Sequence, residues 1–221
     1  NHVVAGELTA SALNTGYVKT LAKGSASPTN TLSLFVNTAN GVVLNGGTSN
    51  NGGTVVTADV QASNGVVHVI NGVLALPTIV NHAVANPNFS ILVQALTRED
   101  QPDFAGILSG TANSPFTVFA PTNEAFVNLL AELNLSGLAD VPQEVLENTL
   151  KYHVVTGANV LSTNLTAGNV TTFQGQDITI GLTGGAKITD ANNRITNIIA
   201  TDVQSSNGVI HAIDQVLLPA L

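Results

Sequence analysis

The residue types used in nucleophilic catalysis meet in one short stretch near the end of the sequence. Ser205, Ser206, His211 and Asp214 fall within ten residues. A hydroxyl activated by an imidazole that a carboxylate orients is the arrangement of a serine hydrolase. These residues share one predicted hairpin, however, and the strand–turn–helix elbow that exposes a nucleophile is missing. We therefore expect no catalytic residues and no enzymatic activity.

The histidines are the next candidates for chemistry, as bases or as metal ligands. None of the five lies four residues from another, so no helix face would present a zinc-binding pair. Residues 190–193 (DANN) offer oxygen ligands but lack the alternating acids, central Gly and terminal Glu of a calcium loop, and Asn is favoured in turns. We expect no metal and no cofactor, and we interpret the histidines as hydrogen-bonded residues of the fold.

The composition is that of a folded, sparsely charged protein. The 221 residues are 44% hydrophobic and 9% charged, with a formal charge of −8 and only six Lys plus Arg. Nucleic-acid binding needs clustered basic side chains, and anionic membranes attract the same groups. No run is long enough for a membrane-spanning helix. We expect no nucleic-acid partner and no membrane insertion of these residues.

The sequence contains two copies of one unit. Residues 1–6 (NHVVAG) recur as residues 152–157 (YHVVTG), and residues 59–71 (DVQASNGVVHVIN) recur as residues 202–214 (DVQSSNGVIHAID). The order and spacing are nearly preserved, which indicates a tandem repeat. We predict the C-terminal half of a first unit at residues 1–77 and a complete second unit at residues 78–221.

Half of a globular unit would expose one face of its core, which is unfavourable for a stable monomer. Three explanations stay open. The sequence is trimmed in front, a front segment is disordered, or another chain covers the exposed face.

The complete unit is predicted to begin with helices and to continue with strands. Apolar residues at helical spacing occur in residues 78–85, 89–96 and 103–108. Residues 116–120 form a short strand, and Thr122 and Asp140 are placed to cap two further helices. From Tyr152 onward the period changes to two, with candidate strands at residues 170–174, 177–182, 187–190, 194–203 and 209–216.

The turns of the sequence complete this prediction. Asn192-Asn193 and Asn207-Gly208 are expected to adopt the positive φ of tight hairpins, and residues 45–53 (NGGTSNNGG) are expected to form a flexible, uncharged hairpin tip. Helices followed by antiparallel strands define an α+β class with a compact sheet or sandwich.

Three motifs in this order resemble the fasciclin (FAS1) domain family. Residues 116–126 (FTVFAPTNEAF) resemble its first homology block, Tyr152-His153 resembles its Tyr-His motif, and residues 206–219 (SNGVIHAIDQVLLP) resemble its second block. The resemblance spans essentially the whole chain. It implies a β-sandwich core edged by short helices, with one partial and one complete unit. It also implies a secreted protein, extracellular or anchored at the cell surface, with the periplasm as the alternative.

The resemblance further implies a non-catalytic adhesion module. Its partner would be a cell-surface or matrix protein or a glycan, with self-association as a further option. The family directs attention to a candidate adhesion surface at Tyr152, His153, Asp202 and Val203. The other motif residues are interpreted as structural: His68, Thr122, Asn123, Asn207, Gly208, His211 and Asp214.

The alternative function is a carbohydrate- or lipid-binding surface module. Sugar sites usually present aromatic side chains, whereas this chain has two Tyr and no Trp. A deep apolar pocket would favour the lipid version.

Overall fold

The chain folds as two compact units. The computed structural model describes residues 1–220; Leu221, the last residue of the predicted second unit, lies outside the described residues. Unit 1 comprises Asn1–Pro87 with Val203–Ser206, and unit 2 comprises Asn88–Asp202 with the residues from Asn207 onward. This division places helix α1 (Ile79–Ala85) in unit 1.

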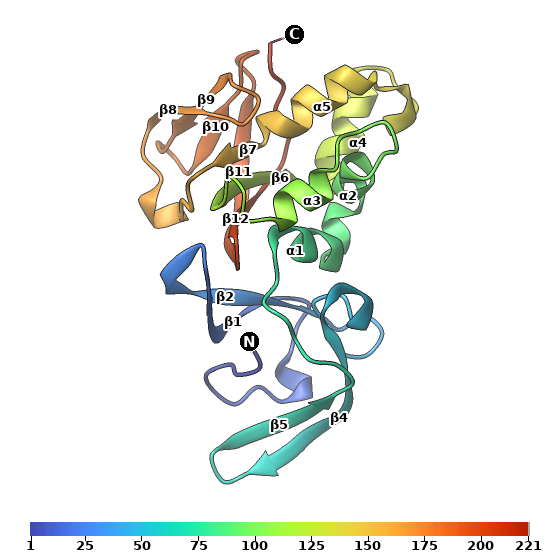
Figure 1. The fold of residues 1–221 in the computed structure, drawn as a ribbon, viewed down its shortest axis with the longest axis vertical. Helices are drawn as coiled ribbons and strands as arrows, with labels where there is room; N and C mark the ends of the chain where they lie inside the picture. Colours follow the sequence, from blue (N-terminus) through green and yellow to red (C-terminus); the bar gives the residue numbers. More distant parts are fainter. Residues whose placement is uncertain (221) are drawn as a thin grey trace. The chain divides into compact units, whose positions relative to one another are not determined.

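Unit 1 is built on a five-stranded sheet. Its strands are ordered β1-β2-β3-β4-β5, and each pairs antiparallel with its neighbour. A small buried cluster of Leu34, Val36, Leu44 and Leu74 forms its core. The strands are β1 (Gly16–Gly24), β2 (Ser27–Asn37), β3 (Val43–Leu44), β4 (Gly53–Ala62) and β5 (Gly65–Ile70) (Figure 1).

The Asn- and Gly-rich loop of unit 1 is packed rather than an exposed hairpin tip. Asn45 and Asn50 are buried. The Asn45 Oδ1 accepts from the Phe35 N–H at 2.8 Å, and the Asn50 Nδ2 donates to the carbonyls of Asn45 and Asn81, each at 2.8 Å. Gly46 has φ +78°, and a Cβ there would lie 3.2 Å from the Ala85 Cα. Residues 45–53 join β3 to β4 as a hairpin connection, as predicted, but they do not form a free tip, because the side chains of Asn45 and Asn50 bind the surrounding main chain.

Unit 2 combines helices with a seven-stranded sheet, which confirms the α+β class with a sandwich-like organisation. The helices gather on one side of the unit (Figure 1), and the strands are ordered β7-β6-β12-β11-β10-β9-β8. The helices are α2 (Ser90–Leu96), α3 (Phe104–Ser109), α4 (Asn123–Glu132) and α5 (Gln143–Tyr152). The strands are β6 (Phe116–Pro121), β7 (Val154–Thr156), β8 (Gly168–Thr171), β9 (Asp177–Gly181), β10 (Lys187–Thr189), β11 (Ile195–Ser205) and β12 (Gly208–Ile213).

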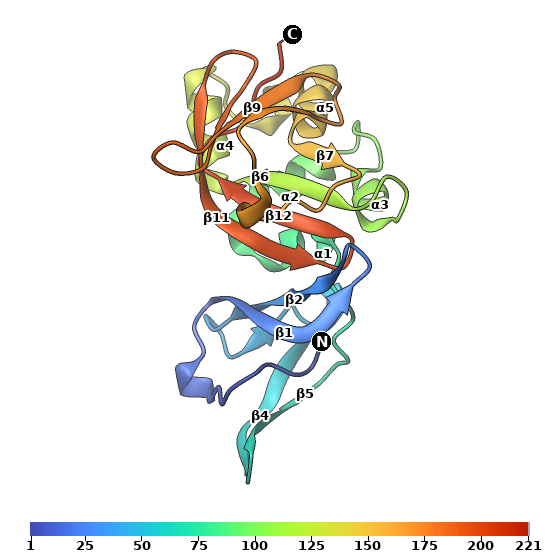
Figure 2. The same cartoon turned by 90° about the vertical axis from the view of Figure 1, so that its left-hand side faces the viewer.

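Two of the sequence motifs pair as neighbouring inner strands of this sheet. Strand β6 runs parallel to β12, from Phe116 opposite Gly208 to Pro121 opposite Ile213 (Figure 2). Every residue of both strands is buried. Phe119 joins Tyr152, Ile213 and aliphatic side chains of β9 and β10 in the main core cluster. The second block is thus covered by the first block along one edge and by β11 along the other.

The helix starts of unit 2 show which local predictions hold. The Thr122 Oγ1 accepts from the Ala125 N–H at 3.4 Å, so the predicted cap of α4 is confirmed. The predicted cap at Asp140 is wrong, because its Oδ2 accepts from the main-chain N–H groups of Ser136 and Gly137, at 2.8 and 3.2 Å. Helix α5 instead follows Pro142, which has no capping side chain. Among residues 1–220, every helix is too short or too polar to cross a bilayer.

Candidate binding site

The Tyr-His motif lies inside unit 2. The Tyr152 hydroxyl donates to the Asp177 carbonyl at 2.7 Å and accepts from the Ala191 N–H at 3.0 Å, and burial raises its pKa. His153 accepts from the Leu217 N–H through Nε2 at 2.9 Å, so the proton of its neutral ring is on Nδ1, 2.7 Å from the Thr149 carbonyl. Burial lowers the pKa of His153 to about 4. Tyr152 therefore joins the end of α5 to β9 and to the turn after β10, and His153 joins it to the segment that follows β12.

The second block repeats this use of a histidine. The Asp202 N–H donates to the His211 Nδ1 at 3.4 Å, and the His211 Nε2–H donates to the Val160 carbonyl at 2.8 Å. The ring stacks on Phe119, with centroids 5.8 Å apart, and burial lowers its pKa. Asp202 has φ 64°, and its carboxylate accepts from the N–H and hydroxyl of Ser162.

The remaining motif residues of unit 2 bind neighbouring segments. The Asn207 side chain donates to the Leu108 carbonyl at 2.7 Å, and Gly208 begins β12 opposite Phe116. The Asp214 carboxylate accepts from the N–H and the side-chain amide of Asn197, at 2.8 and 2.7 Å. The Asn123 Oδ1 accepts from the Ile91 N–H at 2.9 Å. These contacts give each side chain a role in joining elements.

The two predicted turns differ from each other. Asn193 has φ 60°, as predicted, whereas Asn192 is not among the positive-φ residues of the described chain. The positive-φ residues of the described chain do not include Asn207 or Gly208, so that part of the turn prediction is wrong. The side-chain amide of Asn207 donates to the carbonyls of Leu108 in α3 and of Gly110 just after it, which explains an Asn at this turn without a left-handed backbone.

Ser205, Ser206, His211 and Asp214 do not form the geometry of a serine hydrolase. Both ring nitrogens of His211 have main-chain partners, and neither the Ser205 nor the Ser206 hydroxyl bonds to them. The Asp214 carboxylate binds Asn197 instead of orienting the imidazole. Nucleophile, base and carboxylate are close in sequence but are not connected.

In the turn between β10 and β11, the carboxylate oxygens of Asp190 accept hydrogen bonds from the main chain rather than facing a metal site. The Asp190 Oδ1 accepts from the N–H groups of Asn192 and Arg194 at 2.9 and 3.0 Å, and its Oδ2 accepts from the Leu218 N–H at 3.0 Å. Across the described residues, no cluster of three or more His, Asp or Glu could hold a metal ion.

Unit 1 reproduces the same bonds with its own copies of the motif. The Leu74 N–H donates to the His2 Nε2 at 2.9 Å, as Leu217 does to His153. His68 bonds to the Leu8 carbonyl at 2.8 Å and accepts from the Asp59 N–H at 3.4 Å, as His211 does with Val160 and Asp202. Asp59 has φ 60°, matching Asp202. The repeat therefore extends from sequence to individual hydrogen bonds.

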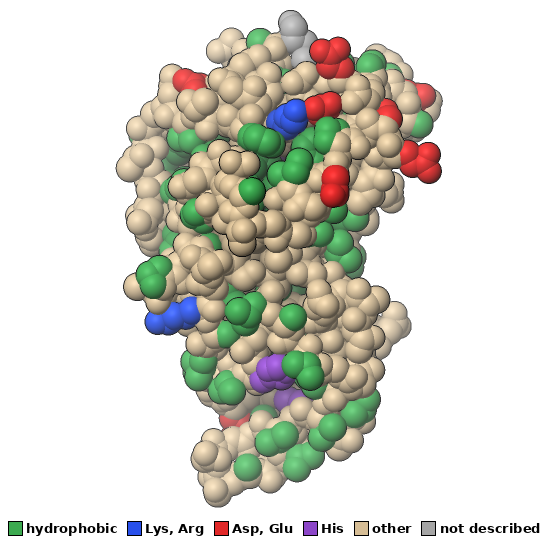
Figure 3. All heavy atoms as spheres, viewed as in Figure 1, with side chains coloured by type: hydrophobic (Ala, Val, Ile, Leu, Met, Phe, Trp, Pro, Cys, Tyr) green, Lys and Arg blue, Asp and Glu red, His purple; other side chains and the backbone are tan. Residues whose placement is uncertain are grey.

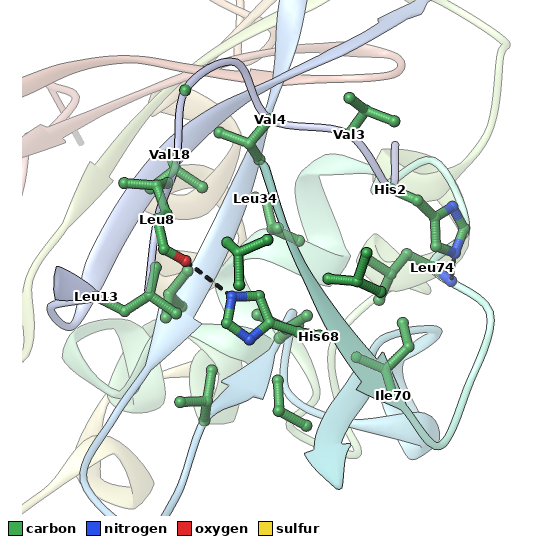
Figure 4. A pocket seen from close by; sticks show the side chains of 17 residues that line it. His2, Val3, Val4, Leu8, Leu13, Val18, Leu34, His68, Ile70 and Leu74 are labelled. Atoms are coloured by element: carbon green, nitrogen blue, oxygen red, sulfur yellow. Dashed lines mark hydrogen bonds between the residues drawn. The ribbon is translucent and has the colours of Figure 1, made fainter. Parts of the chain in front are cut away.

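Unit 1 also contains an open apolar cavity, which sequence reasoning did not locate. Its volume is about 450 Å³. Figure 4 shows His2, Val4, Leu34, His68 and Leu74 around it, with the bond from His68 to Leu8 at its rim. The lining comes from the N-terminal segment, from all five strands of unit 1 and from the loop residues Val42 and Leu74, so no single motif marks it. Among its lining residues the histidines are the only titratable groups.

Fold and site together define a tandem α+β module in which two copies of one motif set are used for internal bonds. A model of the fasciclin domain matches residues 1–77 and 87–219, and the chain belongs to the fasciclin domain family.

Relatives of the chain come from distant organisms. Protein sll1483 from Synechocystis sp. is 39% identical over 145 residues, which cover 65% of this chain and 74% of that protein. Human periostin is 33% identical over 194 residues, which cover 86% of this chain but 21% of periostin. The FAS1 domain pair of the insect cell adhesion molecule fasciclin I has a similar fold, with a TM-score of 0.58 and 23% identity, covering 85% of this chain and 67% of that one.

Proposed function

We propose that this chain is a non-catalytic adhesion module that binds a cell-surface or matrix component, in an extracellular, surface-anchored or periplasmic setting. One observation carries the proposal: the imidazoles and carboxylates of the family motifs in unit 2 are bonded within the fold, which leaves the outer surface for recognition. The similarity to a domain pair of an insect cell adhesion molecule supports the same function.

We place the contact surface of unit 2 on the exposed face of β11. Ile195 and Ile199 are 57% and 55% exposed, although both are large apolar side chains in a strand. Asn197 and Thr201 are exposed between and beyond them, and the half-buried Asp202 follows directly. Of the four residues to which the family directs attention, Tyr152, His153 and Val203 are buried, and Asp202 is the one with partial access.

The chemistry of this face suits a partner recognised by shape and uncharged groups. Two isoleucines supply apolar area, and an amide and a hydroxyl supply hydrogen bonds. With so few charges on the chain, binding should depend weakly on salt. Two units in tandem add avidity if both engage the same surface.

The test is binding of the intact chain to cells, matrix proteins and glycans. Ile199→Lys should weaken binding about tenfold, because it places a charge at the centre of an apolar contact. Val127→Lys on α4 is the matched control, since Val127 is also 55% exposed, and it should leave binding unchanged. Equal losses in both variants, or strong loss of binding in high salt, would contradict the proposal. Sedimentation of the same samples shows whether the partner is a second copy.

A second candidate function, binding of a small apolar ligand such as a fatty acid, is favoured by the cavity of unit 1. Carbohydrate binding has less support, because neither tyrosine is free to stack on a sugar. Tyr17 packs on Phe35 with ring centroids 4.9 Å apart and burial raises its pKa to about 12, while Tyr152 is fully buried. A fatty acid should displace a polarity-sensitive dye from the native chain but not from Val18→Trp, which narrows the cavity. If the fatty acid displaces the dye from both the native chain and the Val18→Trp variant, its binding site lies outside this cavity.

A further inference from the structure

One buried histidine belongs to neither copy of the repeated motifs. His82 lies on α1 and is fully buried, yet neither of its ring nitrogens has a hydrogen-bond partner. The other four histidines each bond through at least one ring nitrogen. An unpartnered polar ring in the interior costs free energy that an aliphatic side chain of similar size would avoid. Departures from such packing rules are concentrated at functional or strained sites.

The ring of His82 lies where three segments of unit 1 meet. It contacts the ring of Tyr17 on β1 edge-on, with centroids 5.5 Å apart. The main chain of Gln204, in the Val203–Ser206 segment of unit 1, and the side chain of Lys19 on β1 also influence its protonation. The imidazole is therefore enclosed by α1, β1 and the Val203–Ser206 segment.

Hydrogen bonds join the same segments around this ring. The Tyr17 hydroxyl accepts from the side-chain amide of Asn86, which directly follows α1, at 3.3 Å. The Ser33 Oγ on β2 accepts from the Lys19 Nζ and from the Gln204 N–H, each at 3.0 Å. Because the imidazole is enclosed, water can deliver a proton to it only after some of these bonds open.

The charges around the ring are unfavourable for an imidazolium. Lys19 is the cation that acts on the ring, and Tyr17 stays uncharged because burial raises its pKa to about 12. The neighbouring β2, η2 (Thr48–Asn50) and Val203–Ser206 segment contain no charged side chain, and α1 contains none besides its histidine. No carboxylate from these elements therefore balances a proton on the ring. Burial, with Lys19 adding to it, lowers the pKa of His82 to about 3.

We propose that His82 makes these segments an acid-sensitive switch, in which proton uptake by the ring moves α1 and the Val203–Ser206 segment away from β1 and β2. The closed form excludes the proton and the open form binds it near pH 6.5, so acid increases the open population. The stabilising contribution of the neutral ring is complete above pH 6.5 and is lost as the pH falls toward 3. Opening should become about 25-fold more favourable from pH 7 to pH 5 and about 200-fold more favourable from pH 7 to pH 4. The proposal is independent of adhesion through β11.

Hydrogen exchange of the intact chain between pH 7 and pH 4 tests the switch. The amides to follow are those of α1 and of Gln204, whose N–H is bonded to Ser33 in the closed form. After correction for the pH dependence of intrinsic exchange, their protection should fall about 200-fold in the native chain. In His82→Leu, which keeps an apolar side chain but cannot titrate, the same protection should fall less than about tenfold. His82→Gln repeats the measurement with a polar side chain that cannot titrate, should the Leu variant fail to fold.

A matched control and a direct observation of the ring complete the test. His2→Leu makes the same substitution at an exposed histidine of unit 1, so the protection of α1 should still fall about 200-fold. NMR of the native chain should show the His82 ring neutral while α1 is closed. The proposal is overturned if α1 is equally acid-sensitive in the native chain and in the His82 variants, or if His2→Leu abolishes the effect. It is also overturned if the His82 ring takes up a proton near pH 6.5 while the α1 amides stay protected.

Discussion

The histidines of the two motifs act as neutral links between elements. His153 can accept from Leu217 and donate to Thr149 only while its ring is uncharged. Protonation would put a hydrogen on Nε2, which would then face the N–H of Leu217 as a second donor. His2 makes the corresponding bond to Leu74 from an exposed position. The same residue type therefore contributes differently to stability in the two units.

Removing these rings should show that difference. His153→Ala leaves a buried carbonyl and a buried N–H without partners and opens a cavity, so we expect a loss of about 2–4 kcal/mol in the free energy of unfolding. His2→Ala should cost less than about 1 kcal/mol, because water can replace its bond. Guanidinium denaturation of both variants measures these losses, and equal losses would contradict the assigned role.

The burial of His153 also predicts a dependence of stability on pH. Its pKa is lowered to about 4 in the folded state, whereas the unfolded state takes up a proton near pH 6.5. The stabilising contribution is therefore complete above pH 6.5 and is lost as the pH falls toward 4. The loss by pH 4 is about 3 kcal/mol. Unfolding free energies of the native chain and of His153→Gln at pH 7, 5.5 and 4 isolate this effect, and parallel pH curves would exclude it.

At the level of elements, sequence patterns located the helices and most strands of unit 2 but not their partners, and they located no strand of unit 1. The apolar spacing and the Thr122 cap predicted α4, and alternation predicted the strands after Tyr152. The parallel pairing of β6 with β12 depends on contacts between residues about 90 positions apart, which no local period encodes. Asp140 does not cap α5 because its carboxylate binds the main-chain N–H groups of Ser136 and Gly137, which precede it.

The candidate site was predictable to a similar degree. The motifs identified buried residues of unit 2, including Tyr152 and His211, and chemistry correctly favoured hydrogen bonding for the four histidines of the repeated motifs, although not for His82, whose ring nitrogens have no partner. Their burial was not readable from residue type, since Tyr and His suit both surfaces and interiors. The cavity of unit 1 could not be located, because residues far apart in sequence line it.

The cap of α4 gives a test at the scale of one element. Thr122→Ala removes the side-chain oxygen that accepts from the Ala125 N–H and should cost about 1 kcal/mol. Thr122→Ser keeps that oxygen and should cost clearly less. Thermal or guanidinium unfolding distinguishes the two, and identical stabilities would mean that the hydroxyl does not support the helix.

The core strand β6 gives a second test at this scale. Phe119 is buried between Tyr152 and Ile213 and stacks on His211. Phe119→Ala should cost about 3–5 kcal/mol, through lost apolar burial and the cavity left behind. Val127→Ala, at an exposed site of α4, should change stability by less than about 0.5 kcal/mol. Guanidinium denaturation provides the comparison, and a small effect at Phe119 would show that the core can collapse around the gap.

At the scale of the whole molecule, the two units share motifs and hydrogen bonds but not the same degree of cover. Unit 2 surrounds its second block with strands on both edges, whereas unit 1 leaves β5 paired on one edge beside an apolar cavity. Figure 3 shows hydrophobic side chains along the β4–β5 hairpin, where Val56, Val60, Val67 and Val69 are exposed. Exposed apolar area of this kind lowers the stability of a unit relative to its covered copy.

This difference predicts unequal protection of two nearly identical strands in one chain. Intrinsic exchange rates of GVVHVI in β5 and GVIHAI in β12 are similar, so any gap in hydrogen exchange reports local stability. We expect the β12 amides to exchange at least about a hundredfold more slowly, because β12 opens only when β6 and the core around Phe119 separate. Exchange followed by mass spectrometry or NMR measures both strands in the same sample. Equal protection would mean that one paired edge and a partial core suffice for this motif.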